Sequence, residues 1–230
     1  FLADGEQAVP LAPSRDHKRR FEGDGGPNTG GMGAYSPVAD GTPALIEQVR
    51  RDVADPILQG MAERGIPYRG FLYAGLMLTP EGPKVVEFNC RLGDPEAQVV
   101  LPLTGAALAE PMAAIARGEG IGDWRADTTD GAALVTVVVS GGYPGAYTKG
   151  HPIEVPRDLD PDLVHVYHAG TANRDGELVT AGGRVIGVTG LGPDLDTAAA
   201  RSRQAAARVR FEGAAWRSDI GHSEIDTAGR

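Results

Sequence analysis

The sequence Lys84-Val-Val-Glu-Phe-Asn-Cys-Arg-Leu-Gly-Asp-Pro-Glu96 combines a candidate β-strand with the start of a candidate helix. Side chains of a β-strand alternate between two faces, and residues 84–91 fit such a strand. One face carries Glu87 and Asn89, about 6.5–7 Å apart along the strand, and Arg91 follows two residues later in the same direction. The opposite face carries the apolar residues Val86, Phe88 and Cys90.

A polar strand face of this kind has two interpretations. The simpler one is the solvated face of a hairpin. In the chemical one, Glu87 and Asn89 supply the hard oxygen ligands that Mg²⁺ or Mn²⁺ prefers when it also holds nucleotide phosphates. Arg91 then pairs with a phosphate or a carboxylate. Cys90 lies on the apolar face, which predicts a small core residue and not a nucleophile.

The neighbours of this strand extend the pattern. Residues 70–78 are rich in apolar and aromatic side chains and predict the first strand of a β-hairpin that returns through residues 84–89. A helix is expected from Pro95, with Asp94 as its N-cap. Asp94 then either only caps the helix or, together with the helix N-terminus, adds an anion site beside the polar strand face.

A glycine-rich stretch lies upstream, Asp24-Gly-Gly-Pro-Asn-Thr-Gly-Gly-Met-Gly-Ala34. It has neither the Gly-Lys-Ser/Thr ending of a Walker A loop nor the spacing of a dinucleotide fingerprint. It is either a mobile surface loop or a cradle whose backbone N–H groups converge on a phosphate or carboxylate. Residues 12–34 as a whole are expected to lack regular structure. Just before the glycine-rich stretch, residues 16–20 form either a phosphate contact or a solvated basic turn.

Composition narrows the classes of function. The 230 residues include 22 Lys and Arg against 31 Asp and Glu, a net charge of −9. This balance argues against a general nucleic-acid binder or a binder of anionic membranes, because both need a basic face. The hydrophobic share of 41 % suits a folded protein, and no apolar run approaches the roughly 18–20 residues that span a bilayer. The single cysteine excludes an internal disulfide framework and a Cys-rich zinc site, and favours a reducing, cytoplasmic setting.

The remaining patterns divide the chain in two. Residues 1–11 predict a strand, a turn at Asp4-Gly5 and a second strand. Thr42 is expected to cap a helix that Pro56 kinks and Gly65 ends. The polar, turn-rich residues 118–131 predict a domain boundary. The other expected elements are a helix over 103–117, strands over 132–140, 164–168, 178–180 and 184–189, and a helix over 196–210.

Several stretches together resemble one family. In the first half they are residues 14–19, 26–37 and 87–96. In the second half they are residues 140–145, 168–171, 182–185 and 217–221, in the order that the family has. The sequence resembles the phosphoribosylamine–glycine ligases of the ATP-grasp superfamily over essentially its whole length. Each motif alone is modest, but their common order argues against chance.

The resemblance implies an α+β fold in which residues 1–120 form the C-terminal half of an ATP-grasp domain. Residues 131–230 would then form a small mixed α/β C-terminal domain of the glycinamide ribonucleotide synthetase type. It also implies a reaction. ATP phosphorylates the carboxylate of glycine, and the amine of 5-phosphoribosylamine attacks the resulting acyl phosphate. The products are glycinamide ribonucleotide, ADP and phosphate, an early step of de novo purine biosynthesis.

By the same resemblance, Glu87 and Asn89 are the metal ligands, with ATP and Mg²⁺ or Mn²⁺ as cofactors. Arg91 and Asp94 are the expected catalytic residues. Arg91 would contact a phosphate or the substrate carboxylate. Asp94 would lie near the amine substrate or fix Arg91.

The expected substrate-binding residues belong to the glycine-rich stretch and to the basic turn before it. They would contact the ribose phosphate or glycine, and they are Asn28, Thr29, Gly30, Gly31, His17 and Lys18. The second domain is expected to shape one wall of the cleft without supplying a catalytic residue.

The family's complete chain carries an N-terminal domain and a lid before the region seen here. The expected partners are therefore glycine, 5-phosphoribosylamine, ATP and the missing N-terminal half of the same enzyme, with no nucleic acid and no membrane. This half alone is expected to bind ATP poorly, to be inactive, and to expose an apolar face where the other half docks. Two alternatives stay open: another ATP-grasp ligase or carboxylase, and a non-catalytic half that binds a partner chain.

Overall fold

The computed structural model describes residues 1–104, 108–126 and 130–228 of the chain. It contains two compact units, each assembled from segments that are distant in the sequence. Unit 1 comprises Phe1–Pro13, Ala39–Gly93 and Thr104–Thr129. Unit 2 comprises Ser14–Val38, Asp94–Leu103 and Asp130–Arg230. Each unit is described by itself, and the domain limits 1–120 and 131–230 stay a prediction.

Unit 1 contains a three-stranded antiparallel sheet with the order β2-β1-β7. Its strands are β1 (Leu2–Asp4), β2 (Ala8–Val9) and β7 (Arg69–Phe71). The strand–turn–strand expected over residues 1–11 is confirmed. Two apolar clusters flank this sheet. One contains Leu2, Val9, Leu108, Ile115 and Ile121, and the other Ala3, Ala8, Ala54, Leu58 and Leu72.

The helical part of unit 1 begins as the sequence predicts. Thr42 is the N-cap of α1 (Pro43–Val49), and its hydroxyl accepts a hydrogen bond from the backbone N–H of Leu45. A π-helical turn, η1 (Arg50–Ala54), leads into α2 (Asp55–Glu63), and Gly65 follows with a φ of +74°. The irregularity therefore lies before Pro56, which occupies the first turn of α2, where a missing N–H costs little. Unit 1 also holds α4 (Ala109–Ala116), within the helix expected over 103–117; residues 105–107 lie outside the described residues.

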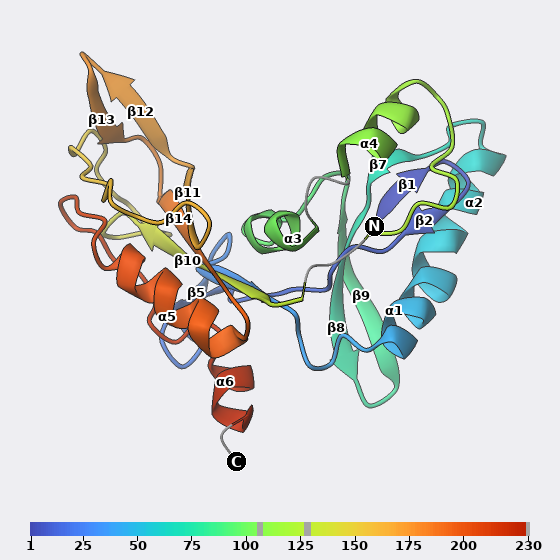
Figure 1. Cartoon of the computed structure of the whole chain (residues 1–230), viewed down its shortest axis with the longest axis horizontal. Coiled ribbons are helices and arrows are strands. Elements are labelled where there is room, and N and C mark those ends of the chain that lie inside the picture. Colours follow the sequence, from blue (N-terminus) through green and yellow to red (C-terminus); the bar gives the residue numbers. More distant parts are fainter. Residues whose placement is uncertain (105–107, 127–129, 229–230) are drawn as a thin grey trace. The chain divides into compact units, whose positions relative to one another are not determined.

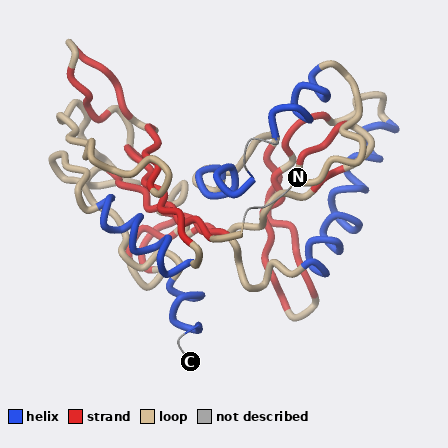
Figure 2. Tube along the Cα trace, in the orientation of Figure 1, coloured by secondary structure: helices blue, strands red, loops and turns tan. Residues whose placement is uncertain are grey.

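The predicted hairpin is present as β8 (Tyr73–Thr79) and β9 (Gly82–Asn89), two antiparallel strands joined by a short turn (Figure 2). Both strands expose large apolar side chains, among them Met77, Val86 and Phe88. The prediction that Cys90 is a core residue is wrong, because its side chain is exposed. Alternation gives a strand an apolar face, but a side chain on that face is buried only where another element covers it.

Unit 2 is built on a five-stranded antiparallel sheet with the order β11-β14-β10-β6-β3. Figure 1 labels three of its strands, β11, β14 and β10. Its strands are β3 (Arg15–Asp16), β6 (Gly33–Ser36), β10 (Ala132–Val139), β11 (Val164–His168) and β14 (Arg184–Gly192). Helix α5 (Leu195–Ala206) packs against β10 and β14, and Asp194 caps it by accepting from the Thr197 N–H. The strands and helix expected in the second half are confirmed, with small shifts at their ends.

The remaining elements of unit 2 are two hairpins and two helices. They are β4 (Arg19–Phe21) with β5 (Gly25–Asn28), β12 (Thr171–Arg174) with β13 (Glu177–Thr180), α3 (Ala97–Thr104, whose last residue belongs to unit 1) and α6 (His222–Ala228). The prediction that residues 12–34 lack regular structure is wrong, because β3, β4, β5 and the start of β6 fall within them. The buried central strand β10 pairs with β6 and recruits this glycine-rich sequence into the sheet.

Among the described residues, no single helix is long and apolar enough to cross a membrane, and only α3 and α4 counted together reach that length and composition.

Candidate functional site

The first group of predicted site residues lies on strand β9 of unit 1. Glu87 and Asn89 are two residues apart on this strand, so both side chains leave the same face. Glu87 stands opposite Gly75 of β8, and a Cβ at Gly75 would lie only 3.0 Å from Glu87 Cγ. The absence of a side chain at Gly75 therefore leaves room for the carboxylate of Glu87 to lie across the hairpin.

Arg91 does not continue this face. Strand β9 ends at Asn89, and Arg91 follows in a bend with an exposed side chain. Its Nη1 donates a hydrogen bond of 2.8 Å to the carbonyl of Leu92. The alternation that aligns Glu87 with Asn89 thus stops before Arg91.

The second group lies in unit 2, in residues 17–31, called here the glycine-rich segment. Main-chain hydrogen bonds fold it back on itself: the Thr29 N–H donates to the Lys18 carbonyl at 2.7 Å, and the Met32 N–H donates to the His17 carbonyl at 2.8 Å. The hydroxyl of Thr29 also donates to the Lys18 carbonyl and accepts from the Gly31 N–H. The segment therefore forms a closed hairpin with Asn28–Gly31 at the end of its returning strand.

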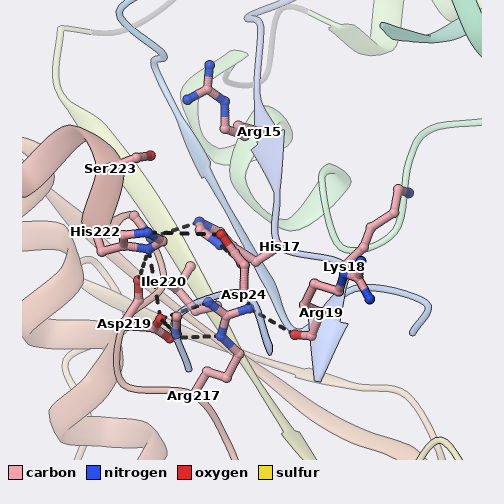
Figure 3. Close-up of polar contacts among 12 residues, drawn as sticks. Arg15, His17, Lys18, Arg19, Asp24, Arg217, Asp219, Ile220, His222 and Ser223 are labelled. Atoms are coloured by element: carbon pink, nitrogen blue, oxygen red, sulfur yellow. Dashed lines mark hydrogen bonds and ion pairs between the residues drawn. The ribbon is translucent and has the colours of Figure 1, made fainter. Parts of the chain in front are cut away.

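Arg217 anchors one end of this segment (Figure 3). Its side chain is 1 % exposed, and it forms two hydrogen bonds of 2.8 Å with the carboxylate of Asp219. It also donates to Asp24 Oδ1 and to the carbonyl of Arg19, both at 2.9 Å. Asp219 in turn accepts from the Gly23 N–H at 2.8 Å. The residues Arg217, Asp219, Asp24, His17 and His222 form what is called here the Arg217 cluster.

His17 lies inside this cluster and is 5 % exposed. The Gly221 N–H donates to His17 Nε2 at 3.1 Å, so Nε2 carries no proton in this arrangement. The neutral ring then carries its proton on Nδ1, which donates to Asp24 Oδ1 at 3.3 Å. Both ring nitrogens of His17 are thus engaged by the protein. Lys18, by contrast, extends away from the cluster (Figure 3). It pairs with Asp16 at 3.0 Å.

The electrostatics follow from burial and from these hydrogen bonds. Burial lowers the pKa of His17, and the hydrogen bond to Asp24 opposes that effect only in part. Burial alone would raise the pKa of Asp219, but hydrogen bonds from Arg217 and the Gly23 N–H outweigh it and bring the pKa to about 2. Burial likewise opposes ionisation of Asp24, but hydrogen bonds from Arg217 and His17 outweigh it and lower the pKa. At neutral pH the cluster therefore holds a guanidinium, two carboxylates and an uncharged His17.

Arg184 anchors the other end of the glycine-rich segment. Its Nη1 donates to the carbonyls of Gly30 and Asp94, at 2.7 and 2.9 Å, and its Nη2 pairs with Asp94 Oδ2 at 2.7 Å. The Gly30 N–H donates to the hydroxyl of Tyr143 at 2.9 Å. The next residue, Gly31, has a φ of +113°, and a Cβ there would lie 2.4 Å from Cδ of the proline that follows Asp94.

The predicted site residues therefore fall into two sets. In unit 2, Arg184 brings Gly30, Gly31 and Asp94 together, and in unit 1 Glu87 and Asn89 share one strand face. The prediction that Asp94 is a helix N-cap is wrong, because α3 begins at Ala97 and residues 94–96 form a turn. The carboxylate of Asp94 accepts instead from Gln98 Nε2 at 3.0 Å and from Arg184.

The structure adds residues to which the sequence patterns assign no role: Arg217, Asp219, Asp24, Arg184 and Tyr143. Arg217 and Asp219 are two residues apart in the sequence. Arg184 follows two glycines at the start of a strand. Those are weak signals, since the contacts that these arginines make with Asp94 and with the glycine-rich segment span between 90 and 198 residues of sequence.

Comparison with known proteins identifies the class of protein to which the fold belongs. Residues 1–97 match the phosphoribosylglycinamide synthetase ATP-grasp (A) domain, and residues 133–223 match the phosphoribosylglycinamide synthetase C domain. A crystal structure of phosphoribosylamine–glycine ligase from Thermotoga maritima superposes with a TM-score of 0.84 at 38 % identity, over 94 % of this chain and 53 % of that one. A biotin carboxylase domain from Hydrogenobacter thermophilus, at 17 % identity and a TM-score of 0.63, shares the fold. The expected ATP-grasp fold class is confirmed.

Relatives give the particular family. A phosphoribosylamine–glycine ligase from Synechocystis is 46 % identical over 97 % of this chain and 54 % of its own length. The trifunctional purine biosynthetic protein adenosine-3 of Gallus gallus is 47 % identical over 97 % of this chain and 22 % of its own length. The chain belongs to the phosphoribosylglycinamide synthetase family, and it spans about half the length of the single-function relatives it matches.

Proposed function

We propose that this chain is the C-terminal part of an ATP-dependent ligase that joins glycine to 5-phosphoribosylamine. The main support is the 44–47 % identity to phosphoribosylamine–glycine ligases and to a trifunctional purine biosynthetic protein over 97 % of the chain. That share of the chain includes β9 and the glycine-rich segment. The common order of the shared motifs in both halves supports the same reaction. We also propose that the remaining part of the active site comes from an N-terminal half, because the single-function relatives are about twice as long as this chain.

The donor set on β9 fits a divalent cation. One carboxylate and one amide oxygen on the same strand face are hard ligands, suited to Mg²⁺ or Mn²⁺ that also binds phosphate oxygens. The biotin carboxylase domain of similar fold was crystallised with ADP and magnesium. In this proposal Glu87 and Asn89 hold the cation, which supplies charge neutralisation to the phosphate groups of ATP.

The proposed reaction balances in two steps. A carboxylate oxygen of glycine takes the γ-phosphoryl group of ATP, which gives glycyl phosphate and ADP. The amine of 5-phosphoribosylamine then attacks the carbonyl carbon, loses a proton, and expels inorganic phosphate. Both steps crowd anions, so Arg91 would bind a phosphate or carboxylate oxygen. Asp94, held by Arg184, would lie near the amine.

The glycine-rich segment is accessible and held in place, as a segment that binds a substrate has to be. Asn28 and Gly30 are exposed at the end of a hairpin, and the segment that carries them is fixed from two sides, by Arg217 and by Arg184. We propose that Asn28, Thr29, Gly30 and Gly31 bind the ribose phosphate or glycine. Lys18 would contact the same anion from the basic turn, while His17 supports the segment from beneath.

Two other functions share the same fold. Another ATP-grasp ligase or a carboxylase would use the same Glu87 and Asn89, so β9 does not discriminate between them. The carboxylases similar in structure are only 16–18 % identical, which supports a common fold and nothing more. A non-catalytic half that binds a partner chain is the other candidate, and the exposed apolar side chains of β8 and β9 favour a covered state for that hairpin.

The deciding experiment combines this chain with the N-terminal half of the Synechocystis relative, as a mixture and as a fusion. ADP release is measured with ATP, Mg²⁺, glycine and freshly made 5-phosphoribosylamine. We expect ADP release only when both halves and both substrates are present. No glycine-dependent ADP from the fusion would contradict the proposed reaction. ADP release that needs bicarbonate instead of glycine would assign a carboxylase.

A substitution in the fusion tests the metal ligands. Glu87→Gln keeps the size of the side chain but removes its charge, and we expect it to lower glycine-dependent ADP release about 100-fold or more. Glu81→Gln is the matched control, because Glu81 lies in the exposed turn between β8 and β9. Equal activities of the two variants would remove Glu87 from the proposed site.

A further inference from the structure

The Arg217 cluster is a buried polar arrangement that the proposed reaction does not use directly. It joins the glycine-rich segment to residues 217–222, about 200 residues further along the chain, through contacts that are mostly hydrogen bonds to charged groups (Figure 3). Hydrogen bonds of this kind are among the stronger ones in proteins. The segment that carries Asn28–Gly31 is therefore held by a contact whose strength depends on charge and protonation.

His17 is the group in this cluster whose protonation conflicts with its contacts. Its Nε2 accepts the Gly221 N–H, and an added proton on Nε2 would turn that hydrogen bond into a contact between two donors. A charged His17 would also face the guanidinium of Arg217. The groups around the His17 ring are Asp24 from the β4–β5 turn, Tyr35 from β6, His222 from α6, and Arg217 with Asp219 from the segment before α6.

A metal ion is the competing explanation for this cluster. Ligand atoms of His17, Asp24 and His222 lie within 4.8 Å of one another. However, Arg217 already occupies Asp24 Oδ1, and both nitrogens of His17 are engaged by the protein. A metal on His17 Nδ1 would require the proton to move to Nε2, against the Gly221 N–H. The geometry therefore favours a hydrogen-bonded contact at this cluster and not a metal site.

We propose that Arg217 and His17 are positioning residues that latch the glycine-rich segment to residues 217–222, and that protonation of His17 opens this latch. The role of the latch in catalysis rests on the proposed function, since it matters there only if Asn28–Gly31 bind substrate. The latch itself is a property of unit 2. It predicts that the segment loosens in mild acid while the sheet beneath it stays folded.

The direction of the pH effect on latching follows from the lowered pKa of His17. A histidine whose pKa is lower in the latched state than in the open one binds fewer protons when latched. Latching is then fully favourable above about pH 6.5, the ordinary value, and weakens as pH falls. Because one proton is involved, the opening constant rises by at most about tenfold for each pH unit. Asp24 and Asp219 have lowered pKa values and stay charged over the same range.

The test is hydrogen exchange of the chain between pH 5 and 7.5, followed by mass spectrometry and corrected for intrinsic exchange rates. Peptides covering residues 20–31 report the latch, and peptides covering β10 report the sheet. We expect opening of residues 20–31 to increase by up to about tenfold per pH unit in acid, with β10 unchanged. A parallel increase in β10 would mean loss of the whole unit and would overturn the proposal.

Substitutions test whether His17 causes the pH dependence of exchange in residues 20–31. His17→Gln keeps an acceptor near the Nε2 position and cannot be charged, so we expect it to abolish the pH dependence of residues 20–31. His168→Gln, on the exposed end of β11, is the control and should behave as the native chain. Arg217→Lys keeps the charge but loses the forked geometry, so it should raise exchange at every pH and keep the slope. A slope that survives His17→Gln, or that vanishes only in His222→Gln, would overturn the proposal.

Two further measurements keep the test decisive if His17→Gln fails to fold. Nitrogen-15 NMR of the native chain reports the tautomer of His17, and we expect the Nδ1–H form at pH 7.5. The Nε2–H form would contradict the latch. Added Zn²⁺ that protects residues 20–31 at micromolar concentration would establish a metal site instead. None of these measurements uses a substrate, so their outcome is separate from that of the ligase assay.

Discussion

At the scale of single residues, the most informative side chain is Arg217. A fully buried guanidinium is tolerated only when its donors are satisfied, and here Nε, Nη1 and Nη2 donate to Asp219, Asp24 and a backbone carbonyl. The arrangement is a salt bridge in which the arginine is inside and the carboxylates reach toward the surface. Its stability therefore depends on the protonation of Asp219.

This dependence predicts a response to acid. The pKa of Asp219 is about 2 in the folded protein, below the ordinary value of 3.8. The folded state then binds fewer protons than the unfolded state between about pH 4 and 2, so the stabilisation is present above pH 4 and lost as pH falls to 2. Asp219→Asn should cost about 1–3 kcal/mol at pH 7, because Arg217 loses one of its two charged partners, and this difference should shrink toward pH 2.

Urea unfolding from pH 2 to 7 measures the effect, followed by the fluorescence of Trp216 in unit 2. The native chain and its variants all carry Trp124→Phe for this purpose, so that no tryptophan of unit 1 contributes to the signal. Asp162→Asn, which removes an exposed carboxylate in a turn of unit 2, is the control and should follow the native chain. A constant difference between the native chain and Asp219→Asn across the whole range would show that Asp219 does not titrate as described.

At the scale of elements, the packing of α5 on the sheet of unit 2 depends on a strand glycine. Gly190 of β14 lies under α5, and a Cβ there would lie 2.2 Å from the carbonyl oxygen of Ala198 and 2.5 Å from the backbone N of Ser202. Both neighbours are helix backbone, so neither can turn away. The small side chains of Ala198, Ala199 and Ser202 bring the helix this close to the strands.

Gly190→Ala should therefore lower the free energy of unfolding by several kcal/mol, about 3 or more, because the helix has to move away from the sheet. Gly60→Ala is the matched comparison. Gly60 lies inside α2, and a Cβ added there would meet no atom within 4 Å, so alanine should raise stability by about 0.5–1 kcal/mol. Thermal unfolding of both variants is the measurement, and equal effects would contradict this account of α5.

The sequence predicts the local features of these elements well. The hairpin of β8 and β9, the Thr42 cap and the helix α5 follow from alternation, capping chemistry and an alanine-rich pattern, all of which act within a few residues. The same reasoning misses β3 to β6. Their glycines and charges give no strand pattern, and β6 is a strand because it pairs with β10, about 100 residues later.

The candidate site likewise contains residues that local sequence patterns predict and residues that they do not. Glu87 and Asn89 are recognisable because one strand carries both residues. The anchors Arg184 and Arg217 are not, because their partners come from other parts of the chain. Cys90 and Asp94 show the limit of local patterns most clearly: an apolar face is not buried without something to cover it, and the turn before α3 delays the helix start past the Asp-Pro pair.

At the scale of the whole molecule, the chain has two units with separate apolar cores. The clusters around Leu58 and Leu2 lie in unit 1, and those around Val138 and Ile220 lie in unit 2. Compact units with their own cores usually open as separate cooperative units. A core substitution should therefore weaken one unit more than the other.

Leu58→Ala, in unit 1, should cost about 2–5 kcal/mol, because Leu58 is 1 % exposed. Hydrogen exchange should then accelerate in β1 and β7 and stay unchanged in β10 and β14. Gly190→Ala should give the reverse pattern. Equal acceleration of all four strands in either variant would show that the two units unfold together.

The sheet of unit 2 has a consequence for how this gene can change. Strands β3 and β6 belong to the segment that matches the ATP-grasp (A) domain, whereas β10, β11 and β14 belong to the segment that matches the C domain. The pairing of β6 with β10 joins the two sequence modules in one sheet. Recombination that exchanged one module would have to supply a strand edge matching the other. We therefore expect the modules to be inherited as a pair, because a cut between them would leave each with part of a sheet.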